Sequence, residues 1–162
     1  MKHVKLFEDF GSSASLTEEQ MGWLHKCTDG SWIFNQSTRS VDINGNFSCV
    51  GQGLTDFKGV IFGEVDGDFD CDNNNLSSLE GAPRYVEGGF YCGKNKLTSL
   101  AGAPEKVGRD FDCSNNQLTN LAGAPSSVGG NFYCQYNSIT NMNGLPRMIG
   151  RNTYSKGNPI DM

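Results

Sequence analysis

The hydrophobic and polar positions of this chain follow one pattern that repeats every 21 residues through its second half. The full copies share the pattern F-x-C-x-x-N-x-L, with Gln52 at the Asn place of the first copy and Ile139 at the Leu place of the last full copy. The copies begin at Ile43, Val65, Val86, Val107, Val128 and Ile149. The first copy is divergent and carries one extra residue, and the last copy is truncated. A unit this short does not bury its own hydrophobic face, so the pattern predicts about six turns stacked along one axis.

Each copy predicts one short strand followed by an irregular return segment. Phe69 and Cys71 are two residues apart and therefore point to the same, inward side of a strand. Asn74 follows where the chain leaves the strand, and its amide is suited to bonding backbone groups of neighbouring turns. Leu76 then faces inward, and Pro83 fixes an extended backbone. Stacked copies would form one parallel sheet, with room on the other side for 3₁₀, polyproline or irregular structure rather than a full helix.

This motif resembles the leucine-rich repeat, in which the pattern is L-x-L-x-x-N-x-L. Here Phe and Cys stand at the first two leucine positions, and the continuation L-T-x-L-x-x-x-P is seen at residues 97–104 and 118–125. It looks most like the short repeats of secreted effectors of Gram-negative pathogens. Over residues 43–160 the resemblance implies a curved, right-handed solenoid of stacked parallel strands with an irregular or 3₁₀ convex side. Those effectors often carry a separate ubiquitin-ligase domain, for which this chain has no room.

Three segments are expected along the chain. Residues 1–14 are predicted to be a flexible N-terminal segment, residues 15–42 a helix and hairpin that cap the N-terminal end, and residues 43–162 the solenoid. In the truncated last copy, Thr153 and Ser155 replace Phe and Cys, which suits a turn that closes the solenoid against water.

The cap is predicted from two local signals. Thr17 and Gln20 have the spacing of a capping box at the start of an amphipathic helix over residues 15–24. Residues 32–34 and 41–43 are apolar runs on either side of a polar turn, which predicts a hairpin leading into the first repeat.

The first residues form a short amphipathic run followed by a Gly-Ser-rich linker. This run resembles the N-terminal segments of many proteins of large tailed bacteriophages, some of which are cleaved after an L-x-E tripeptide. Leu6, Phe7 and Glu8 fit that tripeptide. The resemblance implies a phage protein that acts in the host cytoplasm or travels inside the virion. A frayed terminus without any signal is the alternative.

Composition narrows the classes of partner. The chain has 162 residues, with 13 Lys and Arg against 18 Asp and Glu, for a net charge of −5. This charge has the wrong sign for nonspecific binding to phosphates, so duplex nucleic acid is not expected as a partner. No apolar run approaches the ~20 residues of a membrane span, and no secretory signal is visible. These features favour one soluble, cytoplasmic domain.

Five of the six cysteines occupy one position of the repeat, namely Cys49, Cys71, Cys92, Cys113 and Cys134. Because no C-x-x-C occurs and a secreted context is absent, we expect a ladder of buried thiols. Zinc binding and a ladder of disulfides stay open as alternatives.

Candidate catalytic and metal chemistry is sparse. The two histidines, His3 and His25, precede the repeats, and no P-loop or nucleotide-binding fingerprint is present. Aspartates alternate from Asp66 to Asp72, but the EF-hand pattern fails at its glycine and glutamate positions, which leaves only a looser oxygen-ligand site as an alternative. We therefore expect no enzymatic activity, no cofactor and no metal.

The outward positions of the predicted strands are the candidate binding site, because folding constrains them least. They are rich in Tyr and Asp, which supply contact area and steer a basic partner. The residues expected to bind a partner are Asp68, Asp70, Asp72, Tyr91, Asp110, Asp112, Tyr133, Gln135 and Tyr154. The alternative is that they are soluble fillers of an exposed sheet.

The function that follows is a protein-binding module whose partner has a basic or mixed surface, such as a host defence or regulatory protein. The rival interpretation is a structural or virion-internal protein, or a scaffold subunit that self-associates. Basic residues between each Pro and the next strand offer a second edge of opposite sign or a solvated face. They are Arg84, Lys106, Arg109, Arg147 and Arg151. The sequence leaves the oligomeric state open.

Overall fold

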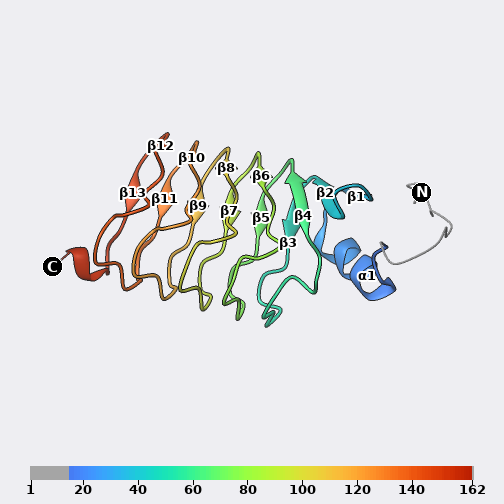
Figure 1. The fold of residues 1–162 in the computed structure, drawn as a ribbon, viewed down its shortest axis with the longest axis horizontal. Helices are drawn as coiled ribbons and strands as arrows, with labels where there is room; N and C mark the ends of the chain where they lie inside the picture. The colour runs from blue at the N-terminus through green and yellow to red at the C-terminus, as the bar shows by residue number, and fades with distance from the viewer. Residues whose placement is uncertain (1–14, 162) are drawn as a thin grey trace.

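The computed structural model describes residues 15–161, which wind into a parallel-strand β-solenoid of about five turns with one short α-helix at its N-terminal end (Figure 1). The turns follow one another at the 21-residue spacing of the sequence repeat. The predicted repeat architecture is thus confirmed at the level of a solenoid of stacked parallel strands.

The strands predicted from the Phe-x-Cys motif form a six-stranded parallel sheet. Its members, in chain order, are β3 (Phe47–Ser48), β5 (Phe69–Asp70), β7 (Phe90–Tyr91), β9 (Phe111–Asp112), β11 (Phe132–Tyr133) and β13 (Thr153–Tyr154). Each strand pairs with its neighbours at equivalent positions, so Phe69 lies beside Phe90 and Phe90 beside Phe111. The repeat therefore sets the register as well as the strand positions.

A second sheet, which the sequence analysis did not predict, lies where each chain segment returns toward the next strand. Its seven members are β1 (Ser31–Asn35), β2 (Ser40–Asn44), β4 (Phe62–Val65), β6 (Tyr85–Val86), β8 (Lys106–Val107), β10 (Ser127–Val128) and β12 (Met148–Ile149). Prolines explain four of its strands, β6, β8, β10 and β12. A buried proline such as Pro83 fixes an extended backbone, and the next N–H, that of Arg84, then donates to the carbonyl of Gly63 in the turn before, at 2.8 Å.

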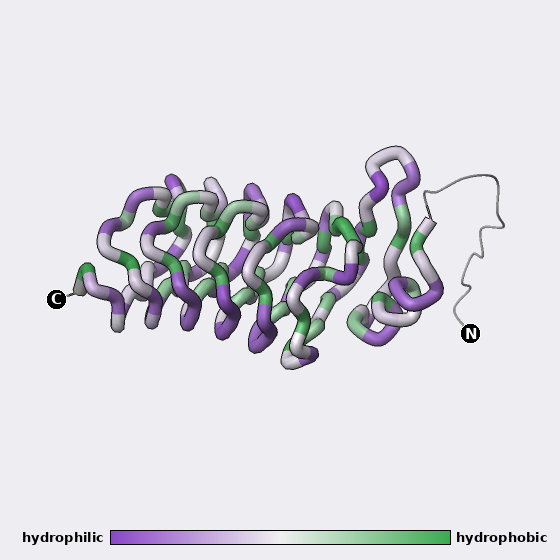
Figure 2. Tube along the Cα trace, turned by 60° about the horizontal axis from the view of Figure 1, so that its bottom comes forward, coloured by the Kyte–Doolittle hydropathy of each residue, from purple (hydrophilic) through white to green (hydrophobic). Residues whose placement is uncertain are grey.

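The rest of each return segment consists of turns and bends, as expected, and a 3₁₀ helix follows the last strand as η1 (Pro159–Asp161). Figure 2 shows hydrophilic residues at the bends of the turns and hydrophobic residues along the segments between them.

Rows of identical side chains fill the interior. The Phe rings stack from turn to turn, with centroids 5.4 Å apart for Phe69 and Phe90 and 5.3 Å apart for Phe111 and Phe132. The cysteines of the repeat are fully buried beside them, and no disulfide links any cysteine of the described residues. The predicted ladder of buried thiols is confirmed.

A row of asparagines closes one side of the core. Asn74 donates from Nδ2 to the carbonyls of Cys49 and Cys71, at 2.9 and 3.1 Å, and accepts the N–H of Leu54 at 3.0 Å. Equivalent bonds recur at the later Asn positions. This arrangement satisfies backbone groups of two turns at once, as the sequence predicted.

The N-terminal end is covered by α1 (Glu18–Cys27), whose capping box between Thr17 and Gln20 is formed. Trp23 of this helix packs edge-on against Phe47 of the first turn, with centroids 5.4 Å apart. The predicted hairpin is formed by β1 and β2, the antiparallel pair that begins the seven-stranded sheet.

Candidate functional site

The outward face of the six-stranded sheet carries five of the predicted binding residues in one continuous row, and the other four flank it. In each two-residue strand the first residue is a buried Phe, except for the exposed Thr153 of β13, and the side chain of the second residue faces out. The second positions pair directly across neighbouring strands in the order Ser48, Asp70, Tyr91, Asp112, Tyr133 and Tyr154. Because strands lie about 4.8 Å apart, this row is roughly 24 Å long. We call these six residues the central row.

The aromatic end of the central row is preorganised. The rings of Tyr133 and Tyr154 stack with centroids 4.9 Å apart and an interplanar angle of 8°. Tyr154 is 40% exposed, whereas Tyr133 and Tyr91 are half-buried. Tyr91 lies over the backbone of Gly89, where an added Cβ would meet its hydroxyl oxygen at under 3 Å. Burial, followed by the charge of Asp68, raises the pKa of Tyr91.

In the acidic part of the face, the ionised forms of two carboxyl groups are disfavoured. Burial, followed by the charges of Asp70 and Asp112, raises the pKa of Asp72 to about 7. Burial also raises the pKa of Asp70, and the N–H of Asp72, which donates to Asp70 at 3.1 Å, only partly offsets this. Asp72 accepts the N–H of Gly93 at 2.6 Å. These half-buried carboxyl groups lie close enough to oppose one another's ionisation, a condition that a neighbouring cation relieves.

Like Asp72, two further predicted residues have a structural partner in the next turn. Asp68 accepts the backbone N–H of Gly89 at 2.7 Å, and Asp110 accepts that of Asn131 at 2.7 Å. Each of these bonds ties one turn to the next. A signal for this role is present in the sequence, because a short Asn or Asp side chain recurs directly before the inward Phe or Thr in five of the six copies.

Gln135 flanks the row beside Tyr133 and differs from the other predicted residues. Its side chain is half-buried, and its Oε1 atom is buried without a hydrogen bond from any described residue. A buried acceptor without a donor carries a free-energy cost of about 1–3 kcal/mol. A donor supplied at this place would remove that cost.

Of the basic residues predicted to form a second edge, Arg84 already interacts with an acidic and an aromatic neighbour. Arg84 donates to Glu105 at 2.8 Å and lies over the ring of Tyr85, 5.1 Å from its centroid. Tyr85 also donates from its hydroxyl to Glu105 at 3.0 Å. This edge is therefore a mixed surface rather than a positively charged one.

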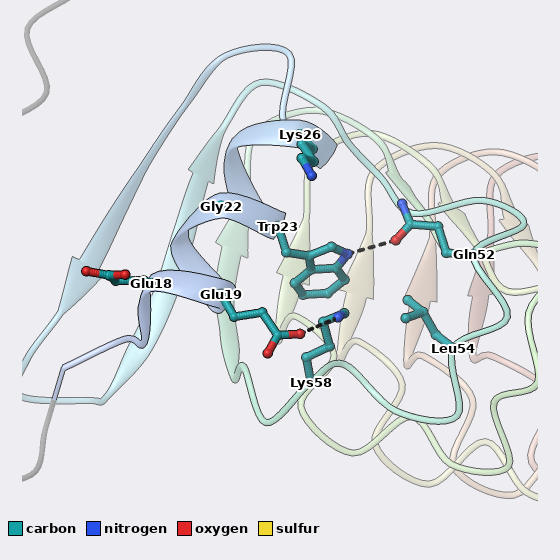
Figure 3. Close-up of a pocket in the computed structure, with 8 residues that line it drawn as sticks. All are labelled: Glu18, Glu19, Gly22, Trp23, Lys26, Gln52, Leu54 and Lys58. Carbon is teal, nitrogen blue, oxygen red and sulfur yellow. Dashed lines mark hydrogen bonds and ion pairs between the residues drawn. The ribbon is translucent and has the colours of Figure 1, made fainter.

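A hollow of about 490 Å³ between α1 and the first turn was not predicted (Figure 3). Trp23 lies at its centre and donates from Nε1 to Gln52 at 2.9 Å, and Lys58 pairs with Glu19 at 3.0 Å across its mouth. The hollow is wide, and two of its four charged groups, Glu19 and Lys58, already pair with each other.

Within residues 15–161, the thiols and His25 are not brought together into a reactive group. Burial raises the pKa of Cys49, Cys71, Cys92 and Cys113, which disfavours the nucleophilic thiolate. His25 is exposed on α1, with its ring 5.2 Å from that of Trp32. Within residues 15–161 no group of three or more His, Cys, Asp or Glu side chains is arranged to hold a metal ion.

Comparison of the chain with protein-family models, with curated proteins and with solved structures finds no match. Across the described part of the chain, no helix combines the length and the apolar character needed to cross a membrane. The predicted cleavage tripeptide Leu6-Phe7-Glu8 lies outside the described residues.

Proposed function

We propose that this protein is a non-enzymatic binding module that holds another protein through the central row and the carboxyl groups beside it. The observation that carries this proposal is the in-register row in which Asp70, Tyr91 and Asp112 lead into the stacked pair Tyr133 and Tyr154. Stacked tyrosines offer a broad contact area whose side-chain entropy is already reduced before binding.

The charge of this face indicates the chemistry of the partner. The charges of Asp70 and Asp112 disfavour the ionised form of Asp72, so a basic side chain placed beside Asp72 gains from relieving that repulsion. An Arg guanidinium also stacks well on a tyrosine ring. The partner we propose therefore presents Arg or Lys beside an apolar or aromatic residue.

The repeat family of the solenoid and the origin of the protein are part of the same proposal. We propose that the solenoid is a right-handed leucine-rich-repeat protein of phage origin that acts on a host protein in the host cytoplasm. The F-x-C-x-x-N-x-L repeats and the asparagine row support the first part. The resemblance of the N-terminal run to phage proteins supports the second.

A displayed library of random peptides tests the binding proposal without knowledge of the host. Selection on the wild type is expected to enrich peptides that combine Arg or Lys with an aromatic residue. The selected peptides are then measured against a Tyr133→Ala, Asp112→Asn variant and against Thr98→Ala, an exposed position on a return segment. We expect at least a tenfold rise in Kd for the first variant and no change for the second.

Asp112→Asn preserves the oxygen that accepts the N–H of Ser114 at 2.8 Å, so the turn should stay folded, which circular dichroism checks. Equal binding of the selected peptides by the wild type and the double variant would refute the central row as the binding site. Enrichment of acidic peptides would refute the proposed partner chemistry.

A further inference from the structure

The two most exposed large hydrophobic side chains of the described residues lie at opposite ends of the solenoid. Ile33 is 68% exposed and Met148 is 67% exposed. Ile33 belongs to β1 and Met148 to β12, and these are the two outermost strands of the seven-stranded sheet (Figure 1). Both edges of one sheet therefore end on an exposed apolar residue.

These two residues also lie on the same face of that sheet. Ile33 pairs with Asp42, whose neighbours Val41 and Ile43 point into the core, so Ile33 faces outward. Met148 pairs with Ser127, while Val128 beside it is buried, so Met148 faces outward as well. A strand β1 added beside a strand β12 would continue the outward row without a change of face.

The inward row is continued in the same way. At one edge it ends on Trp32 and Phe34 of β1, and at the other on Ile149 of β12. All three are only partly buried and pack against the core from its ends. Joining the two edges would cover apolar surface of both rows at once.

The charges of the two ends are complementary. Residues 15–44 carry four acidic and two basic side chains, and residues 145–161 carry three basic and one acidic side chain. The N-terminal end of one copy therefore attracts the C-terminal end of another. Two C-terminal ends would repel each other, because Arg147, Arg151 and Lys156 would face the same residues of the other copy.

The surface beside β12 is open to a neighbour. A groove of about 320 Å³ runs along it, and its lining includes Gly129 and Gly150 next to Met148. Strand edges with exposed apolar side chains are sites where another strand adds.

We infer that copies of this chain associate head to tail, with β1 of one copy adding to the β12 edge of the next. The interface is heterologous, because each copy contributes a different end. It leaves the central row uncovered, so this association does not depend on the function proposed above.

Analytical ultracentrifugation of the full chain and two charge variants tests the inference. The weight-average mass of the wild type is expected to rise with concentration from the micromolar to the millimolar range, and to rise less in high salt. Ile33→Lys and Met148→Lys each place a charge on one edge, and each variant alone is expected to stay monomeric. Ile61→Lys, at a residue 53% exposed away from both edges, is the matched control and should behave as the wild type.

Mixing the two variants gives the decisive result. The Ile33→Lys copy retains an intact C-terminal edge and the Met148→Lys copy an intact N-terminal edge, so the mixture is expected to form a dimer that grows no further. Self-association of Ile33→Lys alone would show a tail-to-tail contact and overturn the inference. A wild type that stays monomeric throughout, or an Ile61→Lys variant that loses association, would overturn it too.

Discussion

The side-chain oxygen of Asn116 accepts the backbone N–H of Leu97 from the preceding turn at 2.9 Å, while its Nδ2 donates to the carbonyl of Cys92 in that same turn at 3.0 Å. One side chain therefore supplies both a donor and an acceptor to backbone groups of the preceding turn. Bonds of this kind hold adjacent turns together where the strands end.

Replacing Asn116 with alanine is expected to lower the free energy of unfolding by about 2 kcal/mol or more, because buried backbone groups of two turns lose their partner. Asn115→Gly is the control, since Asn115 is exposed and has a φ of 55°, a conformation that glycine adopts easily. Urea denaturation followed by circular dichroism measures both. A loss at Asn116 no larger than at Asn115 would contradict the role of the asparagine row.

Two glycines are expected to respond to alanine in opposite directions. At Gly129 an added Cβ would meet the carbonyl oxygen of Gly108 in the preceding turn, so Gly129→Ala should destabilise the protein by about 1–3 kcal/mol. At Gly22 on the exposed side of α1 nothing lies within 4 Å, so Gly22→Ala should stabilise it by about 0.5–1 kcal/mol. Thermal unfolding of the two variants gives the comparison. Equal responses would show that turn spacing is not limited by these backbones.

The thiol ladder predicts slow cysteine chemistry. Burial raises the pKa of Cys71, Cys92 and Cys113, so both access and thiolate formation are disfavoured in the native state. We expect these thiols to react with Ellman's reagent at least about tenfold more slowly in the native protein than in guanidinium. Six thiols should be titrated after unfolding without reductant. A lower total would indicate disulfides.

The carboxyl group of Asp72 predicts a pH dependence of stability. Its pKa is raised to about 7 in the folded protein, against about 4 for an unfolded chain, so its protonated form stabilises the fold. That contribution is present below pH 4 and is lost as the pH rises toward 7. Since the group is partly exposed and solvent screens it, we expect a loss of about 1 kcal/mol.

Asp72→Asn should therefore gain stability over the wild type between pH 4 and pH 7, and the difference should stay constant above that range. The asparagine can still accept the N–H of Gly93, so this change tests the charge and not the hydrogen bond. Denaturation at several pH values, with and without added salt, gives the difference. A gap of the same size at pH 4 and pH 8 would refute the electrostatic origin.

Much of the fold was predictable because each turn repeats the same local rules. The period, the inward Phe and Cys, the turn asparagine and the helix that begins after Thr17 all depend on residues close in sequence. The central row was predictable for the same reason. A constant period places equivalent outward residues side by side once the turns stack.

Other features depend on contacts between turns. The second sheet arises because extended segments after each proline meet their equivalents one turn away, as Arg84 meets Gly63. The stacking of Tyr133 on Tyr154 and the inter-turn bond of Asp68 likewise need the spacing between turns.

The sequence by itself determined the repeat, the inward and outward faces and the capping helix, since these follow from side-chain periodicity and local hydrogen bonding. Only the tertiary structure decided that Ile33 and Met148 end the same face of one sheet, and that Asp72 is half-buried beside other carboxyl groups. Both depend on distances between residues far apart in the chain, and the packing of successive turns fixes those distances.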